Sequence, residues 1–305
     1  MDYIMMNSNA YRPLTAMPFK EDETYTEVLP RHIALAKYIR CYWGSSNPYL
    51  KREEHGVTST VIPDTCVDII YRIDHTDHTV EGGFCGINDS VFWSRDDRTR
   101  GHLISTFAIR FYAWGAYVFT EDSLKNTVNG FYDVQSRFGW LDRILRQQLL
   151  ERHSMEERIW IVEEAFLRRL SQEVRIPAPA GSGMSAGTKI RQNHVIDHAV
   201  SQILRHKGAV STEILSRECF VSSRQLERLF HEYIGITPKK LCNLIRYQYL
   251  WSDIICNPGL QTADAVYRYG YTDQSHLLRE FKRYHTMDIR QARECAYRNV
   301  GKQEN

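Results

Sequence analysis

The 305-residue sequence lacks an apolar run of the length that crosses a bilayer, about 18 residues. Its N-terminus, MDYIMMNSNAYRPLT, also lacks the basic start and the sustained apolar stretch of a secretion signal. These absences predict a soluble protein of the cytoplasm that has no membrane partner.

Paired cysteines are also absent. The seven cysteines are scattered, odd in number and never separated by two residues, which argues against a disulfide framework or a zinc knuckle. The sequence contains no phosphate-binding loop, dinucleotide fingerprint or zinc-protease motif. We therefore expect a protein that is not an enzyme and that needs neither a cofactor nor a metal.

Proline and glycine are concentrated in one segment, SQEVRIPAPAGSGMSAGTKIRQN at residues 171–193. Because they interrupt both helices and strands, we expect a linker at residues 177–189. It separates an N-terminal domain, residues 1–176, from a C-terminal domain, residues 190–305. Residues 189–305 carry 18 Lys and Arg against 12 Asp and Glu, whereas residues 1–188 carry 21 against 25. A basic module attached to an acidic remainder fits a nucleic-acid partner.

The N-terminal domain has the alternating pattern of β-strands over residues 57–112. TCVDIIYRI and HLISTFAIRFY are its clearest strands, and DHTDHT and EGGFCG are expected to be breaks between them. Two helices should follow: FGWLDRILRQQLLERH, and a second that starts at a capping box of Ser154 and Glu157. Their apolar faces must be covered by the sheet or by a second copy of the chain.

The strand at residues 102–112 has one apolar face and one mixed face, and the mixed face carries His102, Thr106, Arg110 and Tyr112. We favour a solvent face over a pocket lining, because such alternation is typical of any half-exposed sheet. If the face lines a pocket, Arg110 would bind an anionic group and a tryptophan would stack on the ligand. The candidate effector residues are then Trp93, His102, Arg110, Tyr112 and Trp114.

The C-terminal domain contains an internal repeat. EILSRECFVSSRQLERLFHEY at residues 213–233 returns 51 residues later as DAVYRYGYTDQSHLLREFKRY. In each copy a short helix leads into a turn with Cys219 or Gly270 at its bend, and a second helix begins after a capping Ser222 or Asp273. The pattern predicts two helix-turn-helix units, residues 211–233 and 262–284. The fold class is therefore α+β, with a mainly β sheet or barrel domain followed by an all-α domain.

The second helix of each unit would lie in the major groove of DNA. Arg228 and Arg279 can pair with guanine, Gln274 with adenine and Glu227 with cytosine, and Leu278 can touch a thymine methyl. A solvated amphipathic helix is the competing interpretation of one copy, but two capped copies make it weak.

The segments SSRQLERLFHEYIGITPKKL and YGYTDQSHLLREFKRY resemble the DNA-binding domain of the AraC/XylS family of bacterial transcription regulators, over residues 190–295. The resemblance implies two helix-turn-helix units joined by a long helix. The implied base-reading residues are Arg224, Glu227 and Arg228 in the first unit, and Gln274, Ser275 and Arg279 in the second. After the second unit the usual Gly-x-Thr-Pro is replaced by residues 286–289, where Asp288 can still cap the last helix.

The stretch from Pro238 to Cys256 would form a helix of about 28 Å at 1.5 Å per residue. One turn of B-DNA is about 34 Å, so such a strut could hold two reading helices about one turn apart. Basic residues near helix starts or on groove-facing helices are expected to contact phosphate: Lys239, Lys240, Lys282 and Arg290.

The N-terminal half more faintly resembles the sensory domains that precede such units, through LAKYIRCYW, VIPDTCVDIIY and FAIRFYAWGAYVF. This implies a role in sensing or dimerisation. The sequence therefore predicts a sequence-specific transcription regulator with double-stranded DNA as partner. A small-molecule effector, a homodimer and, for an activator, RNA polymerase are its further expected partners.

Two other functions remain open. The first is a DNA-binding module fused to an enzyme with a metal site at His75, His78 and His102, although a solvated turn is the better interpretation of HTDH. The second is an architectural DNA binder without an effector.

Overall fold

The computed structural model describes residues 11–17, 25–45, 48–50, 59–94, 101–171, 192–257 and 259–296. The predicted linker at residues 177–189 lies outside these ranges. Among the described residues, no helix is long and apolar enough to cross a membrane.

Two antiparallel sheets form the N-terminal part. The smaller sheet has the order β1-β5-β8, and the larger has the order β10-β7-β6-β9-β3-β2 with β4 beside β9. The strands are β1 (Ala16–Met17), β2 (Tyr25–Val28), β3 (Ile39–Ser45), β4 (Tyr49–Leu50), β5 (Ser59–Val61), β6 (Cys66–Asp74), β7 (Thr79–Cys85), β8 (Phe92–Ser94), β9 (Leu103–Tyr112) and β10 (Phe131–Asp133). The described strands form open sheets with ends at β10 and β2, so the sheet alternative is confirmed and no closed barrel is present among them.

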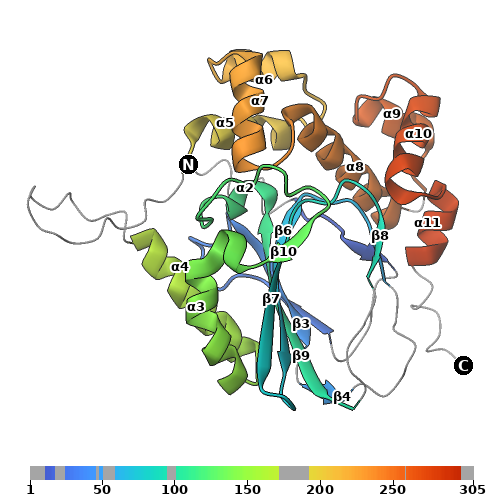
Figure 1. Cartoon of the computed structure of the whole chain (residues 1–305). Coiled ribbons are helices and arrows are strands. Elements are labelled where there is room, and N and C mark those ends of the chain that lie inside the picture. The colour runs from blue at the N-terminus through green and yellow to red at the C-terminus, as the bar shows by residue number, and fades with distance from the viewer. Residues whose placement is uncertain are drawn as a thin grey trace, which may run out of the picture.

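Helices α3 (Gln135–Glu151) and α4 (Met155–Ser171) lie along one face of the larger sheet, whereas the C-terminal helices lie across one end (Figure 1). Phe111 of β9 stacks on Phe138 of α3 at 5.9 Å and meets Phe166 of α4 edge to face at 5.6 Å. Ser154 and Glu157 form the predicted capping box, with the Glu157 amide donating to Ser154 Oγ at 3.2 Å. The sheet thus covers the apolar faces of both helices.

The prediction that EGGFCG is a break between strands is wrong, because its first five residues, 81–85, belong to β7. Its glycines leave room for neighbours. A Cβ on Gly83 would lie 2.0 Å from the Phe131 ring of the adjacent strand, and one on Gly82 would lie 2.5 Å from Val134 at the start of α3. The two glycines therefore let Phe131 and Val134 pack closely against β7, which a larger residue would prevent.

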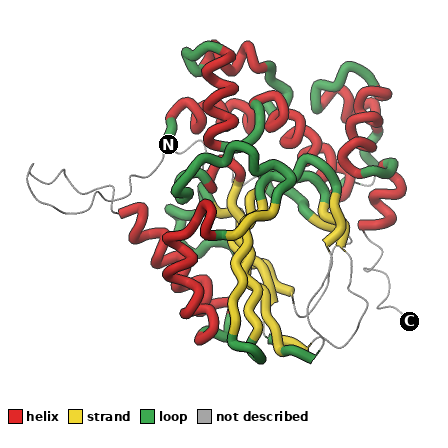
Figure 2. The backbone as a smooth tube through the Cα atoms, viewed as in Figure 1, coloured by secondary structure: helices red, strands yellow, loops and turns green. Residues whose placement is uncertain are grey.

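The C-terminal part is helical, in contrast to the mixed N-terminal part (Figure 2). Its helices are α5 (His194–Arg205), α6 (Thr212–Glu218), α7 (Ser223–Tyr233), α8 (Pro238–Cys256), α9 (Thr262–Arg268), α10 (Gln274–His285) and α11 (Ile289–Ala296). Together with α2 (Ala113–Ala116), they complete the α+β fold.

The repeat is less regular than one fixed shift suggests. Helices α7 and α10 start 51 residues apart, as expected, but α6 and α9 start 50 residues apart, so the second turn is one residue longer. The bend of the first unit is therefore at Phe220 (φ 55°) and not at the buried Cys219, whereas Gly270 (φ 65°) is at the bend of the second unit as expected.

The two halves are in direct contact. Gln248 of α8 is buried, accepts a hydrogen bond from the Leu14 amide at 2.8 Å and donates to the carbonyl oxygens of Leu14 and Pro63 at 2.9 and 2.6 Å. The carbonyl of Glu232, at the end of α7, accepts from the Leu124 amide at 3.0 Å. The long helix of the C-terminal part is thus also a packing surface for the N-terminal part.

Candidate nucleic-acid interface

The second helix of each unit begins at the predicted cap. Ser222 Oγ accepts from the Gln225 amide at 3.2 Å, and Asp273 Oδ1 accepts from the His276 amide at 2.7 Å. These bonds satisfy amides of the first turn that have no partner within the helix. Both helices therefore have defined N-terminal turns.

Each of these helices buries one face and exposes the other. Leu226 and Phe230 of α7, and Leu277 and Phe281 of α10, are at most 1% exposed. All predicted base-reading residues lie on the exposed face: Arg224, Glu227, Arg228, Gln274, Ser275 and Arg279. This face presents guanidinium, amide, carboxylate and hydroxyl groups, which are the groups that read base edges in the major groove.

Helix α8 holds both units. Thr237 Oγ1 caps it by accepting from the Lys240 amide at 3.2 Å, and Pro238 occupies its first turn. Arg246 of α8 forms an ion pair with Glu280 of α10 at 3.2 Å, and Tyr271 Oη donates to Glu280 at 3.0 Å. The 19 residues of α8 span about 28 Å.

The last turn differs from the turn after the first unit, as the sequence implied. Gly235, after α7, has φ 92°, and Thr286 takes the left-handed conformation after α10 with φ 61°. Asp288 Oδ1 caps α11 by accepting from the Gln291 amide at 2.8 Å, as predicted. A threonine at this turn therefore still allows α11 to form.

The four predicted phosphate contacts have different surroundings. Lys239, Lys282 and Arg290 are exposed, and Arg290 is paired with the exposed Glu294 at 2.9 Å. Lys240 is half-buried and forms an ion pair with Asp89 of the N-terminal domain.

The five predicted effector residues have separate surroundings. Trp93 is 63% exposed on β8, and His102 donates to or accepts from Asp74 through Nδ1 at 2.7 Å. Tyr112 stacks on Trp114 at 4.9 Å, and both are buried.

The solvent interpretation of the mixed face of β9 is wrong at Arg110 and Tyr112, which are 9% and 4% exposed. Segment 11–15 packs over them. Arg110 donates to Thr15 Oγ1 at 2.7 Å and to both carboxylate oxygens of Asp68 at 2.6 and 2.8 Å. The anion expected at Arg110 is thus a carboxylate of the protein itself.

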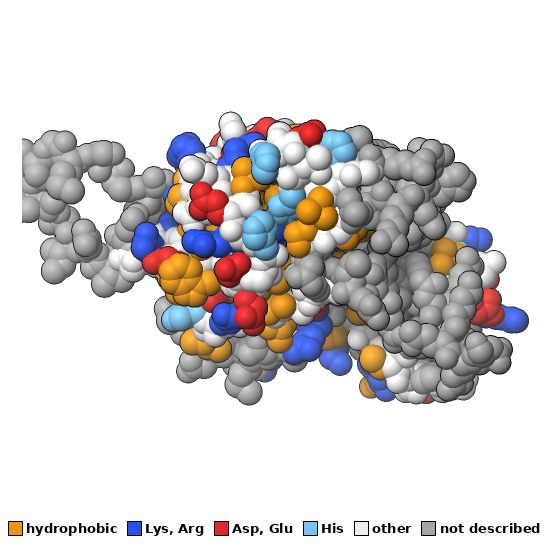
Figure 3. All heavy atoms as spheres, turned by 90° about the horizontal axis from the view of Figure 1, so that it is seen from below, with side chains coloured by type: hydrophobic (Ala, Val, Ile, Leu, Met, Phe, Trp, Pro, Cys, Tyr) orange, Lys and Arg blue, Asp and Glu red, His pale blue; other side chains and the backbone are white. Residues whose placement is uncertain are grey.

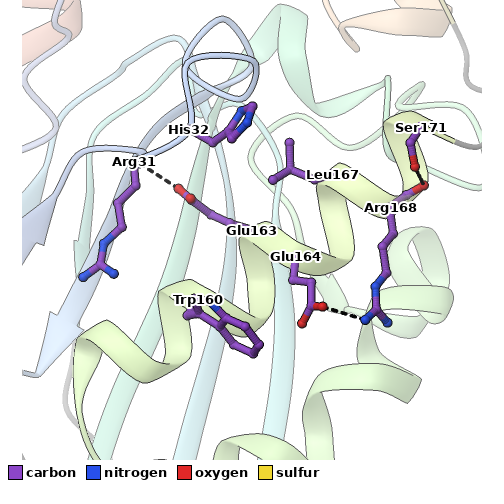
Figure 4. Close-up of a pocket in the computed structure, with 8 residues that line it drawn as sticks. All are labelled: Arg31, His32, Trp160, Glu163, Glu164, Leu167, Arg168 and Ser171. Carbon is purple, nitrogen blue, oxygen red and sulfur yellow. Dashed lines mark hydrogen bonds and ion pairs between the residues drawn. The ribbon is translucent and has the colours of Figure 1, made fainter.

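The structure also reveals a hollow of about 600 Å³ beside α4 that the sequence did not indicate. Figure 4 shows Trp160, Glu164, Leu167 and Arg168 of α4 at this hollow, opposite Arg31. Trp160 is 59% exposed, which is unusual for the largest apolar side chain. The sequence did not indicate that Trp160 is exposed, because the spacing of Trp160 and Leu167 is also that of the buried face of an ordinary amphipathic helix.

Asp74, Asp77 and His102 place one potential metal ligand each within 4.8 Å of one another, at the end of the sheet opposite the C-terminal helices. Histidine side chains are visible beside acidic ones on this end (Figure 3). The enzyme hypothesis had grouped His75, His78 and His102, but His75 is hydrogen-bonded to Ser105 at 2.9 Å. The Asp74 carboxylate also accepts from the Thr76 and Asp77 amides, so it stabilises the turn.

Comparison with known proteins agrees with this geometry. Residues 215–294 match a family model described as a helix-turn-helix domain, and residues 26–132 match one described as a domain of unknown function. A search of curated proteins found no match.

Among solved structures, ToxT from Vibrio cholerae O395 is 12% identical, covering 83% of this chain and 98% of its own, with a TM-score of 0.38. ToxT from V. cholerae strain SCE256 with a bound unsaturated fatty acid is 11% identical, covering 84% and 95%, with a TM-score of 0.37. The xylose-binding transcription activator xylR is 15% identical, covering 45% and 39%, with a TM-score of 0.31.

Two capped, outward-facing helices on one strut, together with the family match, define a DNA-binding transcription regulator. Its C-terminal domain is similar to DNA-binding domains of the AraC type.

Proposed function

We propose that the regulator recognises one promoter or operator sequence by placing α7 and α10 in successive major grooves. The supporting observation is that six side chains suited to base readout are exposed on two helices tied to the same α8. The proposed base-reading residues are Arg224, Glu227, Arg228, Gln274, Ser275 and Arg279. The proposed phosphate contacts are Lys239, Lys240, Lys282 and Arg290.

Selection of bound duplexes from a random library by the full chain tests this proposal. Arg228→Ala and Arg279→Ala should each weaken binding to the selected duplex by about 1 to 3 kcal/mol and relax the preference at one base pair. Arg143→Ala, which removes an exposed arginine of α3, is the matched control. Equal losses on selected and random duplexes would mean that the two arginines contact phosphate alone.

We further propose that the N-terminal domain adjusts DNA binding by taking up a small-molecule effector, by pairing two subunits, or both. The hollow beside α4 supports pairing, because it combines the exposed Trp160 with side chains of both charges, Arg31, Glu164 and Arg168. A two-fold interface needs such a self-complementary patch. RNA polymerase would be a further partner if the protein activates transcription.

Two measurements separate this function from its rivals. Bound metal in purified protein, lost in Asp74→Asn and His102→Gln variants, would favour the metal-dependent enzyme. Equal affinity for every duplex sequence would favour the architectural binder.

A further inference from the structure

Asp89 lies in the loop between β7 and β8 and points toward the C-terminal domain. Its amide donates to Asn129 Oδ1 at 2.9 Å, and Asn129 Nδ2 donates to Asp89 Oδ1 at 2.6 Å. The second carboxylate oxygen, Oδ2, accepts a hydrogen bond from Lys240 Nζ. The Asp89 side chain is only 13% exposed, and the two hydrogen bonds with Asn129 hold this anion in place from its own domain.

The charges that face Asp89 come from α8 and from the second helix-turn-helix unit. Lys240 is in the first turn of α8, directly after the first unit, and Arg283 is on α10 of the second unit. Burial raises the pKa of Asp89, but hydrogen bonds from Lys240 and Asn129 and the charges of Lys240 and Arg283 hold this pKa below its usual value. The carboxylate is therefore ionised at neutral pH.

We infer that Asp89 occupies the place of a DNA phosphate at Lys240, so that the N-terminal domain competes with DNA for this cation. The inference rests on the proposed phosphate contact of Lys240. A phosphate that approached Lys240 with Asp89 in place would bring two anions together, which is repulsive. DNA binding must therefore displace Asp89 or proceed against this repulsion.

The surrounding contacts keep this competitor in position. The Glu232 carbonyl at the end of α7 accepts from the Leu124 amide at 3.0 Å and from Ser123 Oγ at 3.1 Å. These bonds come from the same domain as Asp89 and join it to the first reading helix. A signal that shifts the N-terminal domain would thus change both the position of Asp89 and the charge available to DNA.

A double-mutant cycle on DNA affinity in the full chain tests the competition. The variants are Asp89→Asn, Lys240→Gln and the pair, measured on a selected duplex and on a random one. Asp89→Asn should raise affinity roughly fivefold or more on both duplexes, within the usual range of coupling between sites. In the Lys240→Gln background the same change should have a much smaller effect.

Two further variants serve as checks. Asp122→Asn removes an exposed aspartate of the N-terminal domain that is paired with Arg137 at 3.8 Å, so it reports the general effect of one negative charge fewer in that domain. Asn129→Gly removes the hydrogen bonds that hold Asp89 and leaves the charge of Asp89 unchanged. It should also raise the affinity for DNA, so it tests the competition even where Asp89→Asn does not fold.

An equal gain from Asp89→Asn in both Lys240 backgrounds would overturn the competition, because it would show a long-range charge effect alone. In that case wild-type binding to the selected duplex would leave the proposed function intact. Absence of binding to any duplex by wild type, Asp89→Asn and Asn129→Gly would overturn both proposals. Binding by the variants but not by wild type would be the strongest support.

Discussion

His285 is a residue whose role depends on its burial. It lies in the last turn of α10, stacks on Phe281 at 4.3 Å, meets the Trp251 ring at 4.3 Å and is hydrogen-bonded to Tyr247 Oη through Nδ1 at 2.8 Å. Burial lowers the pKa of His285 to about 3. The neutral form is therefore part of the core of the C-terminal domain.

We expect His285 to make the C-terminal domain sensitive to acid. Below about pH 6.5 the unfolded chain takes up a proton at this histidine and the folded chain does not, so stability falls as the pH decreases toward 3. Between pH 7.5 and pH 5 this loss should be about 1 to 2 kcal/mol. The difference in unfolding free energy between wild type and His285→Gln measures it, because other titrating groups cancel.

His276→Gln, on the same helix but partly exposed, is the control. A difference between wild type and His285→Gln that does not change with pH would show that His285 has the same pKa in the folded and the unfolded chain, as an exposed histidine would.

At the same scale, the predicted phosphate contacts should be visible in the salt dependence of binding. Lys239→Ala, Lys282→Ala and Arg290→Ala should each lower the slope of log affinity against log salt by about 1, because each phosphate contact releases counterions. Lys37→Ala removes a lysine that lies over the Tyr38 ring of the N-terminal domain and should leave the slope unchanged. An unchanged slope for one of the first three variants would remove that residue from the interface.

At the scale of elements, the two helix-turn-helix turns differ in the residue at the bend. Phe220 adopts φ 55° with its side chain 95% exposed, whereas Gly270 adopts φ 65°. A side chain in this left-handed region is strained, and glycine is not. The first unit therefore tolerates strain that the second avoids.

Phe220→Gly should relieve this strain and raise the free energy of unfolding by up to about 1 kcal/mol, since the exposed ring contributes little packing. Gly270→Ala should have the opposite effect by a similar amount, because its Cβ would lie 3.1 Å from the Ala209 Cβ at an unfavourable φ. Chemical denaturation measures both. Destabilisation by Phe220→Gly would mean that the ring packs against the protein.

The elements that local sequence specifies were predicted well. The caps Ser222 and Asp273, the capping box at Ser154 and the strands near β6 and β9 depend on neighbouring residues, which a sequence displays directly. The glycines of β7 were misread because their role depends on Phe131 and Val134, which come from elsewhere in the chain. The ion pairs of Arg110 with Asp68 and of Lys240 with Asp89 were not predicted for the same reason. The partners lie far apart in the sequence, so no local pattern indicates the pairs.

At the scale of the whole molecule, residues 184–305 should fold alone and bind a specific site, because the seven C-terminal helices contain their own buried side chains. On duplexes with two half-sites this fragment should bind more weakly than the full chain if the N-terminal domain pairs subunits. Affinities for single and paired half-sites, measured with both proteins, give the difference.

Trp160→Lys in the full chain should reproduce the weaker binding to paired half-sites if the hollow beside α4 is the pairing surface, whereas Ile144→Lys, at a 40% exposed position on α3, is the control. Sedimentation of the full chain and of Trp160→Lys reports the subunit state. If the wild type is monomeric and binds paired half-sites no more tightly than the fragment, the N-terminal domain does not pair subunits. Sensing would then be its remaining role.

The buried Gln248 amide also bears on chimeric regulators. Its three hydrogen bonds end on Leu14 and Pro63, so the helix that spaces the two reading helices is chemically fitted to this particular N-terminal domain. A chimera that joined residues 192–296 to a foreign sensor domain would remove the Leu14 and Pro63 groups that bind this amide. The foreign domain would not necessarily offer hydrogen-bond partners in their place. A buried amide without partners costs about 1 to 3 kcal/mol. The position of Gln248 would therefore have to be redesigned together with any exchange of the sensor.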